Sequence, residues 1–448
     1  MRRPGVWPAR CLAEIAQGRL RARAARVGHS DCVTTTAPEP AAHLSRYAQT
    51  FHAAVGGQHH VASPLGAWLL LALACPAAGG EDLAKLTEVL GCECQAAAET
   101  AAALLASPHP LVAAAAAVWC RPGSVSADWL AGLPEAVEQG AIPSQAESDG
   151  WARRTTSGLI DRFPITADPA IYLILASALA TRVSWEQPFE LAPASALGPD
   201  SPWVSAVSRV LRTPAAGRGH RQFIAATAAG DAAVHTARAR DGLLVTSVAA
   251  APDVAVADVI AAAHGLAIAQ AVGADVARRS LYDLPLCDGP LWSLREEMSA
   301  QAGGELCTAV LPAWSAHSEH DLEDPSLGLA AAAHALGQGD PWDARQAAMA
   351  RYSRTGFEAA AVTAVAVAMS MAAPRRGLRR VAELRFGHPY AVVAVTVDEH
   401  RDRATGEIRR GPWHGVPVFS AWVAEPGDAR REPENAAHGG FAPAAPGL

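Results

Sequence analysis

The stretch GFEAAAVTAVAVAMSM, residues 356–371, decides how this sequence is interpreted. It lies between Gly356 and Pro374 and mixes alanine with β-branched residues, so its preference between helix and strand is weak. At a period of two, one face holds Phe357, Ala359, Ala361, Thr363, Val365 and Val367, whereas Glu358, the only charge, lies on the other. The stretch therefore suits a segment that waits as an exposed loop and later becomes a strand. The alternative is a permanently buried helix or strand in an alanine-rich protein.

The composition of the chain limits its class. With 448 residues, 50% hydrophobic and 18% charged, the chain has enough apolar residues for a large core. A net charge of -7 excludes a chain-wide basic field, so we expect no nucleic acid partner. No long apolar run predicts a membrane span. The first residues contain several arginines but no apolar signal core, which favours a cytoplasmic over a secreted location.

The pattern along the chain predicts one mixed α+β domain over residues 44–426. Residues 1–43 are expected to be a disordered extension, and the Pro/Ala/Gly-rich residues 427–448 a disordered tail. Hydrophobic periodicity and turn residues predict the individual elements. Helices are expected at 45–57, 64–76, 80–91, 95–107, 149–164, 293–301 and 324–337. Strands are expected at 60–62, 111–120, 171–185, 242–250, 307–314, 379–386, 390–398 and 416–426, with a long hairpin loop at 398–415.

Signals of catalysis and of metal binding are absent from the sequence. It contains no Gly-x-Ser-x-Gly elbow, phosphate-binding loop or His-Glu-x-x-His, so we expect no enzyme and no cofactor. Cys92 and Cys94 have close spacing, but no second pair completes a zinc site. Cysteines in apolar runs, such as Cys75, are interpreted as small free hydrophobic residues. The histidines at 59–60 and 317–320 are expected to be solvated.

The hinge-like start of the quoted stretch resembles a known pattern, Glu-x-Gly-Thr-Glu-Ala-Ala-Ala-x-Thr, in the serpin family. Gly356, Glu358, Ala359, Ala360, Ala361 and Thr363 match it in register. Further landmarks follow in the family's order: Ser63-Pro64; Trp151, Thr156, Gly158 and Ile160; Trp185, Pro188 and Phe189; His388-Pro389-Tyr390; and the closing strand PVFSAWVAEP. Together these matches cover residues 44–426, and the chain therefore resembles a serpin.

The resemblance implies about nine helices packed around three β-sheets, with an exposed reactive loop at about 354–374. It implies a monomer whose partner is a serine protease that attacks the loop as a substrate. Insertion of the cleaved loop as a new central strand then traps the acyl-enzyme. Counting fifteen positions from Gly356 places the reactive bond at Ser370–Met371, and one residue of variation selects Met369 or Met371. These side chains predict an elastase- or chymotrypsin-like target, with a subtilisin-like protease as a further option.

The resemblance also implies the residues that control opening of the central sheet: Ser63, Ser177, Gln346, Trp185 and His388. Ser177 and Gln346 stand where the family has Asn and His, and Gly66 replaces a second serine. Phe357 is a bulky group where the family has a small one, and it would enter the sheet first. The altered gate leaves a second interpretation open, a non-inhibitory serpin that serves as a binding or storage protein.

Overall fold

The computed structural model describes residues 39–164, 171–181, 183–214, 219–240, 242–299, 304–337, 344–357, 377–402 and 405–430. All of these belong to one compact unit, Thr36–Leu448. The first described helix begins at Glu39, five residues before the expected start of the domain. At the other end, Gly427 donates its N–H to the carbonyl of Ala313, so the ordered chain continues past 426.

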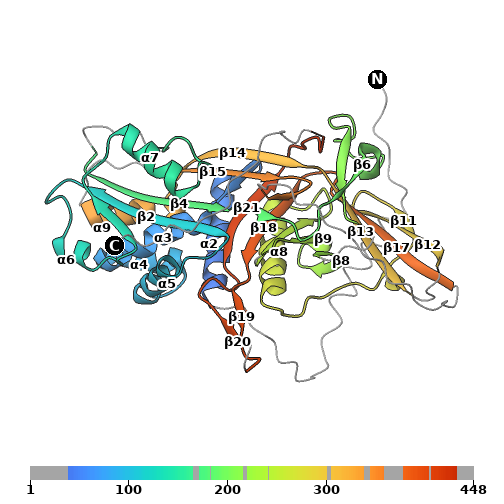
Figure 1. Cartoon of the computed structure of the whole chain (residues 1–448), viewed down its shortest axis with the longest axis horizontal. Helices are drawn as coiled ribbons and strands as arrows, with labels where there is room; N and C mark the ends of the chain where they lie inside the picture. Colours follow the sequence, from blue (N-terminus) through green and yellow to red (C-terminus); the bar gives the residue numbers. More distant parts are fainter. Residues whose placement is uncertain are drawn as a thin grey trace. The chain divides into compact units, whose positions relative to one another are not determined.

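The helices gather around α3 (Pro64–Ala74), in which every residue is buried. A helix that is apolar on all sides must be covered on all sides, and α3 packs against α2, α5, α9, β4 and β21 (Figure 1). The other helices of the described residues are α2 (Glu39–Val55), α4 (Gly80–Leu90), α5 (Cys94–Ala106), α6 (Ala127–Ala131), α7 (Gln145–Thr155), α8 (Val256–Ala271) and α9 (Leu329–Gly337). None of these helices is by itself long and apolar enough to cross a membrane, and only the bent pair α4 and α5, taken together, has the required length and composition.

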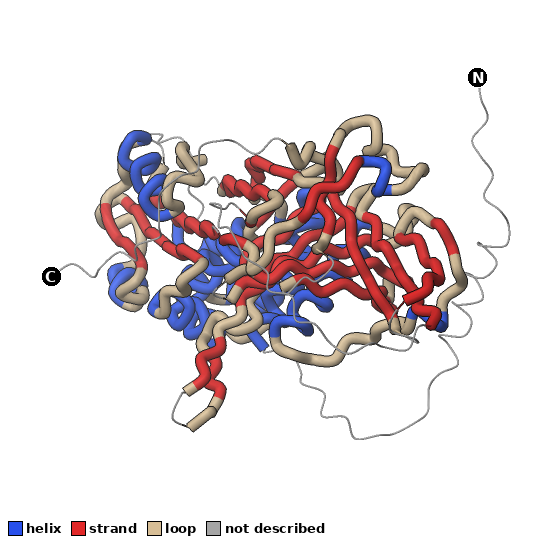
Figure 2. Tube along the Cα trace, turned by 45° about the vertical axis from the view of Figure 1, so that its right-hand side comes forward, coloured by secondary structure: helices blue, strands red, loops and turns tan. Residues whose placement is uncertain are grey.

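Two six-stranded sheets form much of the strand-rich part of the unit (Figure 2). The β18 sheet has the order β1 (His60–Ala62), β21 (Pro417–Val423), β18 (Tyr390–Thr396), β10 (Leu243–Ala249), β9 (Gly230–Arg238) and β8 (His220–Thr227). The β17 sheet has the order β11 (Cys287–Asp288), β12 (Trp292–Ser299), β17 (Gly377–Arg385), β13 (Glu305–Leu311), β7 (Arg209–Arg212) and β6 (Glu190–Pro193). Helix α8 covers β18 and β10.

The central strands form two smaller sheets side by side. The β15 sheet has the order β14 (Trp314–Asp321), β15 (Arg345–Tyr352), β16 (Gly356–Phe357) and β5 (Val183–Ser184). The β4 sheet has the order β3 (Val137–Gly140), β2 (Val112–Cys120) and β4 (Leu173–Thr181). Only residue 182 separates β4 from β5, so the chain itself joins the two sheets. The hairpin β19 (Glu399–Arg401) and β20 (Ile408–Arg410) projects from the body within the expected loop 398–415 (Figure 1).

Two sequence predictions are wrong in the fold. Residues 292–299 form strand β12 instead of a helix, because Glu296 and Glu297 lie opposite Arg380 and Arg379 of β17 and form ion pairs with them. Such cross-strand pairs outweigh a local helix preference. The second concerns Cys75, which is joined to Cys94 by a disulfide between the end of α3 and the start of α5. Sequence spacing alone did not reveal that their Cα atoms lie 5.7 Å apart.

Candidate functional site

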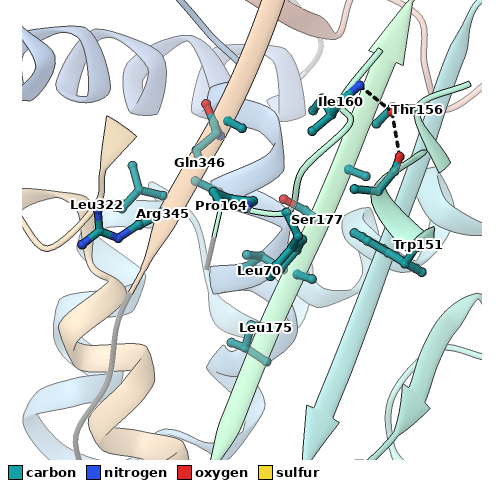
Figure 3. Close-up of a pocket in the computed structure, with 16 residues that line it drawn as sticks. Leu70, Trp151, Thr156, Ile160, Pro164, Leu175, Ser177, Leu322, Arg345 and Gln346 are labelled. Carbon is teal, nitrogen blue, oxygen red and sulfur yellow. Dashed lines mark hydrogen bonds between the residues drawn. The ribbon is translucent and has the colours of Figure 1, made fainter. Parts of the chain in front are cut away.

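An opening separates β15 from β4 in the middle of the central strands. Among the described residues no strand pairing joins β15 to β4. A cavity of about 40 Å³ lies between them, large enough for a water-sized group. Leu175 and Ser177 of β4 line one side and Arg345 and Gln346 of β15 the other, and Trp151 of α7 also lines the cavity, beyond β4 (Figure 3). The strands on both sides are therefore ordered without being paired to each other.

Gln346 connects β15 to the start of α3. Its Oε1 accepts the backbone N–H of Ser63 at 2.9 Å, and its Nε2 donates to the Ser63 carbonyl at 2.8 Å. The Ser63 hydroxyl donates in turn to the carbonyl of Val418 in β21 at 3.0 Å. The sequence predicted a polar pair between Ser177 and Gln346; both side chains line the cavity, but the hydrogen bonds of Gln346 go to Ser63.

Ser177 also lies at the opening, but its role differs from that of its neighbours. Its backbone pairs with Ala116 of β2, whereas its hydroxyl, which lines the cavity, has no hydrogen-bond partner among the described residues. A Cβ placed on Gly66 of α3 would lie 2.8 Å from the Ser177 Oγ. Because Gly66 has no side chain, the Ser177 hydroxyl can lie directly against α3.

Trp185 ties the chain that precedes the hinge-like stretch to the strand region at residues 183–189. Its indole N–H donates to the carbonyl of Ser353 and its backbone N–H to the carbonyl of Thr355, both at 3.0 Å. The backbone N–H of Phe189 donates to the carbonyl of Arg354 at 2.9 Å. The Trp185 ring packs on Tyr352 with centroids 5.0 Å apart. Three successive carbonyls, 353–355, are therefore held in place.

The first two residues of the hinge-like stretch already form a strand. In β16, Gly356 and Phe357 pair antiparallel with Ser184 and Val183 of β5, and Phe357 also pairs with Tyr352 of β15. The Phe357 side chain is 3% exposed and meets the ring of Trp314 edge-on, at 6.2 Å. The exposed segment expected from about 354 thus excludes Gly356 and Phe357. The remaining predicted hinge and reactive-bond residues, Glu358–Thr363 and Met369–Met371, lie outside the described residues.

His388 occupies a different place from the other predicted gate residues. Its Nε2 donates to the carbonyl of Ala250 at 2.8 Å, and burial lowers its pKa. It lines a separate cavity with Leu197, Ser201 and Pro389, and it is not among the residues that line the opening. The structure therefore brings Ser63, Ser177 and Gln346 together at the opening and Trp185 to the hinge, but leaves His388 apart.

Ser353 and two buried histidines were not predicted from the sequence. Ser353 accepts the Trp185 indole N–H and also bonds Gly356 through its backbone N–H and hydroxyl, at 2.9 and 3.0 Å. No sequence signal marks this serine. The expectation that the histidines at 59–60 and 317–320 are solvated is wrong for two of them, because His60 and His320 are buried in β1 and β14. Two signals could have indicated that these side chains are buried: the short strand expected at 60–62 and the alternating burial pattern along β14.

Comparison with solved structures identifies the fold of this chain. No family model matches the sequence, and no curated protein matches it either. Among solved structures, the thermophilic serpin tengpin in its native state has a TM-score of 0.58 at 14% identity, over 89% of this chain and 98% of that one. Thyroxine-binding globulin in complex with thyroxine has a TM-score of 0.56 at 12% identity, over 86% and 99%. Serpin48 of the insect Tenebrio molitor has a TM-score of 0.54 at 14% identity, over 88% and 99%. This chain therefore has the serpin fold.

Proposed function

We propose that this protein inhibits a serine protease as a suicide substrate, by inserting its cleaved loop between β15 and β4. The observation that carries the proposal is β16. Gly356 and Phe357 have entered between β15 and β5, and the unpaired stretch between β15 and β4 continues from that point. The strand β16 therefore runs toward a place where β15 and β4 lack a partner among the described residues.

The free energy of such an insertion supports the proposal. On the order of ten new ladder hydrogen bonds at about 1 kcal/mol each give roughly 10 kcal/mol. Each valine buried on the inward face adds about 1.5 kcal/mol or more. The sum is comparable with the stability of an ordinary domain, so insertion can supply enough free energy to distort a protease. The alternation of 357–367 places no charge on the inward face.

Met369, Ser370 and Met371 define the proposed target. Small and medium apolar side chains suit the pocket of an elastase- or chymotrypsin-like protease, or of a subtilisin-like one. The direct test mixes the purified protein with each class and examines the products on a denaturing gel. An adduct that survives SDS, at the summed mass of protease and loop-cleaved protein, supports trapping. The protein cleaved in the loop should also melt at a higher temperature.

A matched pair of variants separates insertion from cleavage. Ala361 shares the face of Phe357, whereas Ala360 lies on the opposite face. A charge on the inward face must lose its hydration as the strand inserts, at a cost of several kcal/mol. Ala361→Arg should therefore be cleaved without forming the adduct, and Ala360→Arg should still form it. Equal behaviour of the two variants would contradict insertion in this register.

A second candidate function is that of a non-inhibitory binding or storage protein. One observation favours it: the Ser177 hydroxyl at the opening has no hydrogen-bond partner among the described residues. One structurally similar protein is a globulin in complex with thyroxine, so the fold also occurs in a small-molecule carrier. Complete loop cleavage with no adduct and no rise in melting temperature would favour this function over inhibition.

A further inference from the structure

Four buried histidines from four different elements lie close together, one of them in β14 of the β15 sheet. They are His52 of α2, His60 of β1, His264 of α8 and His320 of β14, and each is at most 6% exposed. Ring centroids are 4.9 Å apart for His52 and His60, 6.4 Å for His52 and His264, and 5.8 Å for His60 and His320. We name these four residues the histidine cluster.

The hydrogen bonds of the cluster fix its tautomers. The Nδ1 of His60 lies 2.8 Å from the carbonyl of Gln58 and must donate to it, so its Nε2 accepts. The Nδ1 of His52 then donates to that Nε2 at 2.7 Å, and its own Nε2 accepts the hydroxyl of Ser420 in β21 at 2.6 Å. His320 donates from Nε2 to the carbonyl of Val61 at 2.7 Å. With His52 and His60 both neutral, each of these contacts pairs one donor with one acceptor.

Added protons fit this arrangement poorly. One proton on His60 can be accommodated if the His52 tautomer reverses and Ser420 becomes the acceptor, but a second proton leaves two N–H donors 2.7 Å apart. His264 has no hydrogen-bond partner for either ring nitrogen among the described residues. Burial lowers the pKa of His60 and of His264 to about 4, and it also lowers those of His52 and His320.

Among the described residues, no carboxylate raises the pKa of any histidine of the cluster. On α2 the ionisable Tyr47 is buried and donates to the carbonyl of Leu327. From β1, His59 adds a further repulsion to His60. On β14 the acidic residues Glu319 and Asp321 flank His320 but are exposed, and β21 contributes the neutral Ser420. The described residues also contain no group of three or more side chains arranged to hold a metal ion.

The cluster is connected to the opening. His320 lies directly opposite Gln346 in the pairing of β14 with β15, and Gln346 holds both backbone groups of Ser63. His320 also holds Val61, two residues before Ser63. A movement of β1 or β14 would therefore be transmitted to the Gln346 contact that positions β15 beside the cavity.

We propose that the histidine cluster is an acid-sensitive clamp. At neutral pH it holds β1 and α2 to β14 and β21, and protonation below about pH 6 releases them and loosens the edge of the β15 sheet. The consequence for loop insertion rests on the proposed function, whereas the loosening itself does not.

The sign and size of the effect follow from linkage. A histidine whose pKa is lowered in the folded state contributes stability that is present above its unfolded pKa and is lost as pH falls. For a pKa of about 4 in the folded state and about 6.5 in the unfolded state, lowering the pH from 7.5 to 5.0 reduces the folded-to-unfolded ratio roughly 30-fold per histidine. His264→Phe removes one such group without breaking a hydrogen bond among the described residues.

The test compares the wild-type protein, His264→Phe and the control His317→Gln by chemical denaturation at pH 7.5 and 5.0. His317 is exposed on the same strand as His320. Between pH 7.5 and 5.0, the folded-to-unfolded ratio of His264→Phe should fall roughly 30-fold less than that of the other two proteins. Hydrogen exchange at pH 5.0 should show faster exchange in β1 and β14 of the wild type than of His264→Phe, with β12 and β17 alike in both. His264→Leu serves if the phenylalanine does not fit.

Equal loss of stability in all three proteins, or equal exchange in β1 and β14, would overturn the clamp. A separate arm measures how fast inhibitory activity is lost at pH 5.0, where the wild type should be inactivated faster than His264→Phe. A wild type with no inhibitory activity at pH 7.5 would count against the proposed function, whereas the denaturation and exchange results would still decide the clamp.

Discussion

Truncation of Phe357 tests the most specific feature of the site, the strand β16. Phe357→Ala keeps the backbone pairs with Tyr352 and Val183 but removes a ring that is 3% exposed and packs on Trp314. The ring is buried against Trp314, so its loss leaves a cavity that the surrounding side chains can close only in part. We expect the uncleaved protein to be destabilised.

The magnitude follows from the burial of the ring. A buried Phe→Ala change costs about 3–5 kcal/mol, through lost transfer free energy and the cavity that remains. An unfolding entropy of about 2.1 cal/mol/K per residue gives roughly 0.8 kcal/mol/K for a domain of this size. The melting temperature should therefore fall by about 4–6 °C.

The assay is thermal unfolding at one fixed scan rate, because the unfolding of such proteins is often irreversible. Phe357→Leu is the matched control, since it keeps an apolar side chain and should cost less than about 1.5 kcal/mol. Under the proposed function, Phe357→Ala should also leave protease binding intact and change the ratio of trapped to merely cleaved protein.

One result would refute the reasoning about β16. If Phe357→Ala and Phe357→Leu both melt within about 1 °C of the wild type, the ring does not fill a packed site. If the melting temperature falls as expected but the ratio of trapping to cleavage is unchanged, the strand is real, and its side chain does not limit insertion.

Three further perturbations test the contacts around the opening. Gln346→Ala removes two hydrogen bonds to Ser63 and should lower stability by about 2 kcal/mol, as measured by denaturant midpoint, whereas no loss would show that the contact is replaced by solvent. Trp185→Phe leaves the buried carbonyl of Ser353 unpaired at a cost of about 1–3 kcal/mol, and faster proteolysis near 353–357 should accompany it. Replacing Cys75 and Cys94 by serine opens a 19-residue loop, so the free energy of unfolding should fall by about 3 kcal/mol under oxidising conditions. In dithiothreitol, which reduces the disulfide of the wild type, the difference should be small. An equal difference under both conditions would contradict the disulfide.

The local sequence pattern predicted helices and strands correctly where a single apolar run determines the element. The apolar run at 64–76 predicts a helix, and α3 is a helix in which every residue is buried. The apolar runs at 111–120 and 171–185 predict strands, and β2 and β4 lie within them and are paired with each other. The ordered landmarks from Ser63 to His388 indicated the serpin fold, although no family model matches the sequence.

The tertiary structure decided the features that join distant parts of the chain. Whether Glu296 and Glu297 belong to a helix or a strand depends on arginines more than 80 positions away. His60 and His320 looked solvated one at a time, but the fold buries them together and fixes their tautomers through Gln58 and Val61. The alternation of residues 356–367 determined which side chains can share a face. That Phe357 is already inside was set by Trp314, Tyr352 and Val183, because burial is a property of the neighbours that surround a side chain and not of the side chain alone.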